Sequence, residues 1–425
     1  MSASAFASDP AGTGSPGGTK PGCRPRIAVL GGGVLGVSTA VHLVRRGASV
    51  VLVTEDAVAS GASGRSLSWL NSAGPKSEAY HHLRMAGIDR YRTLLAQHPG
   101  IEWLGFGGGL HWAGGGGGAG GGGEAGGDAG EEAQLRERHD AETAHAYHSL
   151  LLEPEDQRAL ADLEPAVDAA AVTGPVLANP GEGWVSLPHL IDHLLAEFRA
   201  RGGELREHAG RAAVVVKDGR AAGLRLPAGG IAAGDHTSGE HPDAFHESII
   251  AADAVLVAAG PDTPALVADL GVHLPDASDP AMLLITEPVQ TSLASVLNTP
   301  RVSVRPHPGG RLAMDHTWYL DRITRDASGS YAVDPAVVHE LAAEAAAILT
   351  GHPELQPAEW KIGLKPVPGD GLPVLGELES VPGCFVAFTH SGATLGLIAG
   401  ELLAGEMLTG KRHPMLAEFR AERFG

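Results

Sequence analysis

The fold is decided by residues 26–36, RIAVLGGGVLG. The apolar residues 27–30 predict a short buried strand, and the glycines after them match the Gly-x-Gly-x-x-Gly turn of a dinucleotide site. In that turn the first glycine makes the tight bend, the second lets the backbone approach a pyrophosphate, and the third lets the next helix pack on the strand. The three glycines are Gly31, Gly33 and Gly36.

The residues after this turn complete a strand–helix–strand unit. A helix is predicted from Val34 until Gly47 ends it, and a second buried strand over 49–53 leads to Glu55. The N–H groups at the start of such a helix have no partner within it and bind phosphate groups. An acidic residue about 20 positions beyond the glycines accepts hydrogen bonds from a ribose diol. Because no arginine follows Glu55 directly, NADP is disfavoured, while NAD and FAD both remain open.

Composition limits the class of protein. The 425 residues have room for two domains, or for one large α/β unit with an inserted lobe. A net charge of −19 disfavours nucleic acid and anionic membranes as partners. The two cysteines, Cys23 and Cys384, predict no disulfide framework, and the 21 histidines form no pair at metal-ligand spacing. No secretory signal and no apolar run of roughly 18 residues is evident, so the prediction is a reduced, cytoplasmic enzyme without a membrane span.

Three stretches are too rich in small residues to predict compact structure. Residues 1–25 are expected to form a disordered tail, and residues 107–130, which are nearly all glycine, a disordered loop. Residues 228–247 are expected to be a surface insertion.

Apolar patterns predict further elements between these stretches. Residues 80–97 predict an amphipathic helix, and residues 131–165 and 188–200 are also expected to be helical. Hairpins are predicted over 216–226, around Asp218, and over 302–314, which includes Arg305.

Three other stretches offer small residues to a flat ligand. Residues 59–71, rich in hydroxyls and small side chains, can wrap a planar molecule closely. Residues 249–260 predict a buried strand that ends in small residues, where ligands lie in open α/β sheets. Residues 385–396 predict a strand and a small-residue turn before a helix over 394–408, whose N–H groups can meet a polar ligand edge. Two such turns suit a cofactor with a pyrophosphate at one end and a flavin ring carbonyl at the other.

Together these motifs resemble the D-amino-acid oxidase-like FAD-dependent oxidoreductases, the group that includes glycine oxidase, sarcosine oxidase and D-amino-acid dehydrogenase. The matching blocks follow the order of that family. They are residues 27–36 with Glu55, 62–71, 253–260, 363–376 and 390–396.

The resemblance implies an α/β fold in which a Rossmann-like FAD-binding domain carries a second, mixed-sheet substrate domain that roofs the flavin. The expected FAD-binding domain is discontinuous and comprises residues 26–90, 186–275 and 364–425. The expected substrate domain comprises residues 91–185 and 276–363.

The resemblance also implies the contacts to FAD. The glycine turn and the start of its helix would face the pyrophosphate, Glu55 the adenosine ribose, and residues 62–63 the pyrophosphate and ribityl chain. Residues 67–69 would run beside the flavin ring, residues 259–260 under the nucleotide, and residues 392–395 at the pyrimidine end. The whole set is Gly31, Gly33, Val34, Leu35, Gly36, Glu55, Ala62, Ser63, Leu67, Ser68, Trp69, Ala259, Gly260, Gly392, Ala393, Thr394 and Leu395.

One position departs from the family pattern. The family's ribbon usually reads Gly-x-Arg-Pro, and that arginine often binds the substrate carboxylate, but here the residue is Lys365. A lysine pairs with a carboxylate as a point charge, and it can equally be a structural cation at the bend of the ribbon. Arg305 is a second, weaker candidate for the carboxylate. Because neither Cys23 nor Cys384 stands where covalent members carry their cysteine, non-covalent FAD is expected.

The expected reaction is oxidation of a C–N bond in a small amine or amino acid by hydride transfer to flavin N5, followed by electron transfer to oxygen or another acceptor. One alternative is an FAD-dependent 2-hydroxy-acid dehydrogenase, for which His390 is the nearest candidate base. Another is a flavoprotein subunit of a larger oxidase complex. An NAD-dependent dehydrogenase would leave residues 363–396 without a role.

Overall fold

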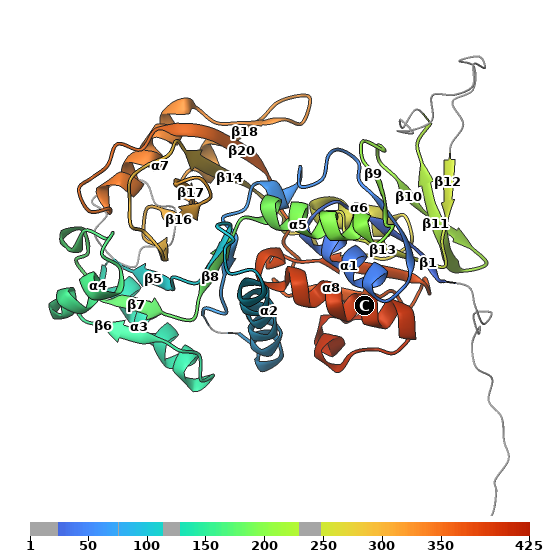
Figure 1. The fold of residues 1–425 in the computed structure, drawn as a ribbon, viewed down its shortest axis with the longest axis horizontal. Helices are drawn as coiled ribbons and strands as arrows, with labels where there is room; N and C mark the ends of the chain where they lie inside the picture. Colours follow the sequence, from blue (N-terminus) through green and yellow to red (C-terminus); the bar gives the residue numbers. More distant parts are fainter. Residues whose placement is uncertain (1–23, 75, 114–127, 229–247) are drawn as a thin grey trace, which may run out of the picture.

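The computed structural model of the chain describes residues 24–74, 76–113, 128–228 and 248–425. Two lobes lie side by side, each built around its own large sheet (Figure 1). Most of the predicted N-terminal tail and most of the two predicted low-complexity insertions lie outside the described residues. Within the described residues, no helix is long and apolar enough to cross a membrane.

The first lobe is organised around the strand predicted before the glycine turn. Its sheet contains, in spatial order, β21 (Val374–Glu377), β22 (Cys384–Phe388), β13 (Ala254–Val257), β1 (Arg26–Leu30), β2 (Ser49–Val53) and β9 (Glu204–Arg206). Neighbouring strands from β22 to β9 are parallel, whereas β21 at the edge runs antiparallel to β22. This confirms the predicted Rossmann-like sheet.

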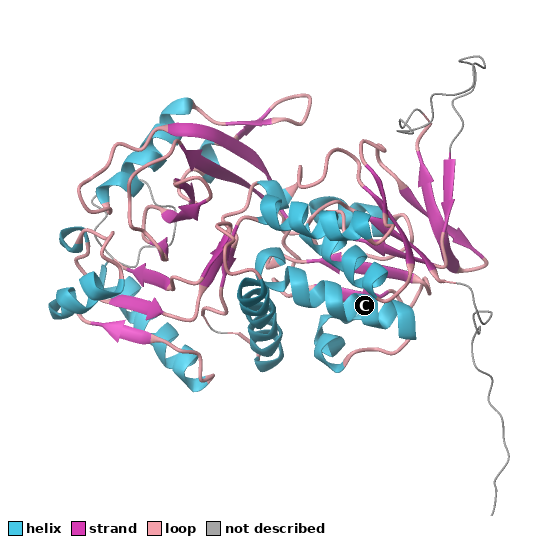
Figure 2. Ribbon diagram, in the orientation of Figure 1, coloured by secondary structure: helices cyan, strands magenta, loops and turns pink. Residues whose placement is uncertain are grey.

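Secondary-structure elements cover both faces of this sheet. Its parallel strands therefore carry apolar side chains on both faces. Ile27 and Val29 of β1 pack in one cluster with helices, and Ala28 and Leu30 pack in the opposite cluster. Three helices of the first cluster run over the sheet, and the helix over 78–97 stands beside them and packs against the helix over 392–409 (Figure 2). The helices are α1 (Val34–Arg45), α2 (Glu78–Gln97), α5 (Leu187–Ala200) and α8 (Gly392–Thr409). The opposite layer comprises β10 (Ala213–Lys217), β11 (Arg220–Leu226), β12 (Ser248–Ala251) and α6 (Thr263–Ala268).

The single strand expected over residues 249–260 is two strands that belong to different sheets. β12 pairs with β11, whereas β13 pairs with β1. Asp253 forms the corner between them, because its N–H donates to the Arg26 carbonyl at 2.7 Å and its Oδ2 accepts from the Arg26 N–H at 2.7 Å. The hairpin predicted around Asp218 is confirmed as β10 and β11.

The second lobe contains the mixed sheet implied by the family resemblance. Its strands, in spatial order, are β20 (Pro357–Lys365), β14 (Asp279–Thr286), β17 (Arg311–Asp315), β16 (Ser303–His307), β15 (Val296–Asn298), β5 (Gly109–Trp112), β7 (Val176–Asn179) and β6 (Leu150–Leu152). β15 and β5 are parallel, and the other neighbours are antiparallel. Helix α7 (Pro335–Ala347) packs against this sheet through Val338 and Leu341.

Two predictions for the second lobe were wrong in part. Residues 109–112 were expected within a disordered loop, but they form the buried strand β5. The glycine of this strand allows close packing, since a Cβ at Gly109 would lie 2.1 Å from Glu182 Oε2. Residues 131–165 were expected to be helical throughout, but β6 interrupts the region between α3 (Asp128–Ala144) and α4 (Gln157–Leu163).

A small sheet lies between the lobes, with β8 visible in the middle of Figure 1. Its strands are β3 (Trp69–Leu70), β8 (Gly183–Val185) and β4 (Leu104–Gly105), and a separate hairpin is formed by β18 (Thr324–Arg325) and β19 (Tyr331–Ala332). Helix α2 continues to Gln97, beyond the predicted domain boundary at residue 90. The division of the chain into domains stays a prediction.

Candidate cofactor and substrate site

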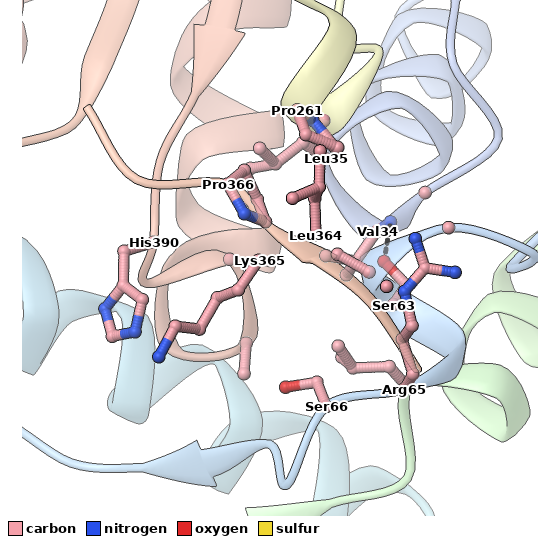
Figure 3. A pocket seen from close by; sticks show the side chains of 18 of the residues that line it. Val34, Leu35, Ser63, Arg65, Ser66, Pro261, Leu364, Lys365, Pro366 and His390 are labelled. Carbon is pink, nitrogen blue, oxygen red and sulfur yellow. Dashed lines mark hydrogen bonds between the residues drawn. The ribbon is translucent and has the colours of Figure 1, made fainter. Parts of the chain in front are cut away.

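A cavity of about 660 Å³ is lined by both lobes. The first lobe contributes the glycine turn, the loop that follows β2, and the carboxyl ends of β13 and β22, which is where ligands bind in open α/β sheets. The second lobe contributes residues of β14, β17 and β20. In Figure 3, Ser63 and Arg65 lie at one side of the cavity and His390 at the other, with Lys365 between them.

The glycine turn requires glycine for two different reasons. Gly31 has a φ of +122°, and a Cβ there would lie 2.1 Å from the Ala258 carbonyl oxygen. A Cβ at Gly36 would lie 2.0 Å from the Gly31 carbonyl oxygen, so both positions are closed by protein backbone. Gly33 is different, because a Cβ there would meet only Ser63 Oγ, at 3.2 Å. The backbone at Gly33 is therefore open to a ligand in the cavity.

The start of α1 is an anion-binding arrangement. Gly33 is its N-cap and supplies no side-chain cap, and the first turn carries no acidic residue. The Val34 N–H donates to Ser63 Oγ at 3.0 Å (Figure 3). The positive end of the helix dipole thus meets the cavity without a negative side chain from its own first turn. This fits a pyrophosphate.

Carboxylates surround the expected ribose position. Glu55, Asp56 and Asp262 all line this part of the cavity, together with Arg211. Burial raises the pKa of Glu55, the neighbouring Asp262 and Asp56 raise it further, and Arg211 acts in the opposite direction. This negative environment accepts hydrogen bonds from hydroxyl groups and repels a phosphate, which agrees with the sequence argument against NADP.

A second helix start opens into the same cavity. Residues 392–394 at the beginning of α8 line the wall, and no side chain caps this helix either. Glycines allow α8 to lie close to α1, because a Cβ at Gly396 would come within 2.6 Å of Val34 Cγ2 and one at Gly400 within 2.3 Å of Ser38 Oγ. The two helix starts therefore lie side by side and open into one cavity, and the residues present fit extended FAD.

Arg84 connects the loop that contains Asn71 to the start of α8. It was not predicted as a site residue. Its side chain is 7% exposed, and its Nε and Nη2 donate to the carbonyl oxygen and Oδ1 of Asn71 at 2.8 Å and 2.6 Å. Its Nη1 donates to Ser391 Oγ at 2.6 Å. A signal was present, since Arg84 lies four residues before Ile88 on the apolar face of the predicted helix.

Lys365 and His390 lie together at the substrate end of the cavity (Figure 3). The His390 ring is exposed to the cavity, and its pKa is lowered to about 4 by the surrounding protein and by the nearby cations Lys365, Arg84 and Lys76. His390 is therefore neutral at pH 7. Among the described residues, no carboxylate lies within ion-pairing distance of the Lys365 ammonium, which leaves it available to an anionic ligand.

Arg305 does not line the cavity and lies in the wall behind it. Its side chain is 1% exposed, and it donates to the Leu67 carbonyl through Nε and to the Pro306 carbonyl through Nη1. Burial lowers its pKa to about 9. The prediction that Arg305 binds a carboxylate therefore does not fit this placement, in which Arg305 instead anchors the loop that contains Leu67.

Most of the expected FAD contacts do line the cavity. They are Gly31, Gly33, Val34, Leu35, Glu55, Ala62, Ser63, Leu67, Ser68, Trp69, Ala259, Gly260, Gly392, Ala393 and Thr394. The other two lie behind the wall: Gly36 contacts the Gly31 backbone, and Leu395 is fully buried in the core. Their individual roles toward FAD stay predictions.

Several polar residues of the second lobe complete the substrate end and were not predicted. They are Asn298, Ser303, Asp315 and His316, from β15, β16, β17 and the residue after β17. Burial raises the pKa of Asp315 to about 6, an effect that Lys365 and Arg305 partly oppose. These residues come from three consecutive antiparallel strands of the second-lobe sheet. No cluster of metal ligands occurs in the part of the chain that the structure describes.

The sequence as a whole matches a family model described as FAD dependent oxidoreductase over residues 26–406. Glycine oxidase from Pseudomonas putida is 24% identical over 412 residues, which cover 91% of this chain and 94% of that protein. Glycine oxidase from Geobacillus kaustophilus is 26% identical over 392 residues, which cover 90% of this chain and 92% of that protein.

Solved structures share the fold over nearly their whole length. The crystal structure of glycine oxidase from Geobacillus kaustophilus superimposes with a TM-score of 0.71 at 22% identity, over 93% of this chain and 98% of that chain. Iminodiacetate oxidase from Chelativorans sp. BNC1 superimposes with a TM-score of 0.71 at 20% identity, again over 93% of this chain and 98% of that chain. The two-lobed architecture described above is therefore that of a known fold.

Proposed function

The chain belongs to the family of FAD-dependent oxidoreductases, and from that premise we propose that it oxidises a C–N bond of a small amine or amino acid. The observation that carries this proposal is one cavity that reaches from the Gly31 turn to the start of α8 and continues to Lys365. The glycine oxidases to which the chain is similar act on an amino acid, as their name states, which supports the same substrate class here.

FAD, when bound, supplies the hydride acceptor at its N5 atom. We propose that the start of α1 holds the pyrophosphate, Glu55 the ribose, and the start of α8 the polar edge of the ring.

Cys384 is buried in β22 and does not line the cavity, which supports non-covalent binding. Acid precipitation should release all of the yellow colour into the supernatant. Colour that stays with the pellet would show a covalent link.

The side chains at the substrate end bind and orient the substrate. Lys365 holds a carboxylate as a point charge, and neutral His390 accepts a hydrogen bond without adding a second positive charge. The amine reacts without its proton, because its lone pair must stabilise the positive charge that develops on carbon as hydride leaves. No strong general base is then required.

Oxidation of a 2-hydroxy acid is the second candidate, and the neutral state of His390 favours it. A hydroxyl group must lose its proton as hydride leaves, and a neutral imidazole can accept that proton. Anaerobic bleaching of the flavin band by amines, amino acids and hydroxy acids distinguishes the two. Bleaching by hydroxy acids alone would overturn the C–N proposal.

Three further expectations stay predictions. A role as one component of a larger oxidase complex would appear as a partner that copurifies at fixed stoichiometry. The electron acceptor, oxygen or another, is identified by the rate at which reduced flavin reoxidises in air. The cytoplasmic location is checked by cell fractionation.

A further inference from the structure

A row of polar residues crosses the second-lobe sheet at the substrate end of the cavity. His111 on β5 pairs with Asn298 on β15, Asn298 with Ser303 on β16, and Ser303 with Asp315 on β17. Asn298, Ser303 and Asp315 line the cavity, whereas His111 is buried behind them. Leu283 and Ala313, on the same face of the sheet, pack in an apolar cluster with Leu67 and Trp184. Polar side chains beside such a cluster are costly to bury without a partner, which favours a ligand at this row.

Hydrogen bonds within the row determine which donor and acceptor groups remain free for a ligand. Ser303 Oγ donates its proton to Asn298 Oδ1 at 2.7 Å, and Asn298 Nδ2 donates to His111 Nδ1 at 3.0 Å. His316 is also engaged, because its Nδ1 accepts from the Trp318 N–H and its Nε2 donates to the Thr299 carbonyl. The free capacity is therefore acceptor capacity, on Ser303 Oγ and on the Asp315 carboxylate.

The Asp315 carboxylate has no hydrogen-bond or ion-pair partner among the described residues. Arg305 lies near it, but its guanidinium donates to the backbone of Leu67 and Pro306. With its pKa raised to about 6, Asp315 still carries a negative charge at pH 7. An unpaired charge in such a wall is costly unless a ligand neutralises it.

Asp315 and Lys365 lie on the same face of the sheet. Register pairs Lys365 with Asp279, Gly363 with Ala281 and Ala313 with Ile285, and residues two apart on a strand share a face. The two side chains thus place opposite charges in one cavity, with strand β14 between them.

We propose that Asp315, with Ser303 Oγ, binds a second cationic group on the substrate, so that the enzyme prefers amino acids with an ammonium or guanidinium side chain. The proposal rests on the proposed function, in which Lys365 holds the carboxylate. The cation that Asp315 binds is not the reacting amine, because a carboxylate there would stabilise the protonated form, which cannot release hydride. Asp315 is therefore a specificity residue, set apart from the reacting centre.

The test compares ligands that match in shape and differ in charge. Arginine and citrulline, and ornithine and norleucine, are titrated as both enantiomers into the flavin-loaded enzyme, with calorimetry for affinity and anaerobic bleaching for reduction. The cationic member of each pair should bind at least about tenfold more tightly, as expected for a charge-assisted contact. In Asp315→Asn that preference should disappear, while Glu359→Gln, an exposed carboxylate on the same sheet, should keep it.

The outcomes separate this inference from the function on which it rests. If amino acids bleach the flavin but arginine and citrulline bind equally well, Asp315 does not select a cation. Retention of the preference in Asp315→Asn would overturn the inference in the same way. If arginine binds more tightly than citrulline but no amine bleaches the flavin, the cation site stands and the proposed oxidation fails. If Asp315→Asn does not retain FAD, the affinities of the unaltered enzyme for arginine and for citrulline decide whether the cation site exists.

Discussion

The two ends of the cavity are built by different means. At the cofactor end, backbone forms much of the site: Gly31 and Gly33 shape the turn, and the starts of α1 and α8 open into the cavity. At the substrate end, side chains from β17 and β20 form it, two strands that β14 separates in the sheet. A short stretch of sequence is enough to form a binding site from backbone groups. A site formed by side chains from several strands exists only once the sheet has folded. The substrate end can therefore change its chemistry while the cofactor end stays the same.

The largest effect is expected within the glycine turn. Gly31→Ala places a Cβ against the Ala258 carbonyl and forces an alanine to a φ of +122°, which should cost about 3 kcal/mol of unfolding free energy and abolish FAD binding. Gly33→Ala, where the Cβ meets only Ser63 Oγ, should fold normally and hold FAD more weakly. Urea unfolding and the flavin-to-protein ratio measure both. Normal flavin content in Gly31→Ala would contradict the backbone account of this end.

A change in unfolding free energy of similar size, but dependent on pH, is expected when Glu182 is replaced. Tyr147 donates to one of its oxygens at 2.7 Å, the other makes no well-formed hydrogen bond, and burial raises its pKa to about 8. The unfolded chain releases this proton near pH 4.5, so the folded state loses stability as pH rises from about 4.5 to 8. Glu182→Gln should therefore be more stable than the unaltered protein by about 3 kcal/mol at pH 8.

The Glu182 measurement is thermal or urea unfolding from pH 5 to pH 8. The two proteins should be nearly equal in stability at pH 5, where the carboxyl group keeps its proton in the folded state. Glu418→Gln, at an exposed position, should match the unaltered protein throughout. A stability difference for Glu182→Gln that is the same at every pH would argue that the residue is ionised in the fold.

Arg84 tests the link between the two ends. Arg84→Met removes the donors to Asn71 and Ser391, so buried acceptors lose their partners, and about 2 kcal/mol of stability should be lost with a shift in the flavin spectrum. Arg92→Met is the matched control on the same helix, because Arg92 makes an exposed contact to the Gly181 carbonyl. If both substitutions lower the stability and shift the flavin spectrum equally, the proposed role of Arg84 in linking the two ends is wrong.

The smallest effect is expected at Lys365. Lys365→Met should leave the unfolding free energy unchanged and weaken the binding of carboxylate ligands about tenfold, since one charge-assisted contact is lost. Lys361→Met, on the same strand with an exposed ammonium, serves as the control. Calorimetric titration with a carboxylate and with its amide shows whether the loss is specific for the charge. Unchanged affinity would make Lys365 a structural cation.

The same contrast explains which parts of the site the sequence predicted. The glycine turn, Glu55 and the turn at residue 392 are local patterns, and each is found on the cavity wall. Asp315 and Ser303 were missed because the hairpin over 302–314 was predicted without its register and without the face of the sheet that lines the cavity. Arg305 was misplaced for the same reason: its position in this hairpin was predicted, but not the direction in which its side chain points.

The fold itself was predictable where periodicity was strong. Helices α1, α2, α5 and α8 and the hairpin β10–β11 were predicted from their apolar patterns. The strand β5 was not, because its glycines resemble a loop when their packing partners are unknown. The corner at Asp253 was missed because the hydrogen bonds that make it connect to the far end of the sequence in β1.

The arrangement of the first-lobe sheet has a consequence for biosynthesis. β1 leaves the ribosome well before its neighbours in the sheet, since β13 begins at residue 254 and the next strand, β22, at residue 384. The helix start that we propose for the polar edge of the flavin follows only at residue 392. A growing polypeptide can therefore form the glycine turn early but cannot complete this cavity until residue 392 has been synthesised.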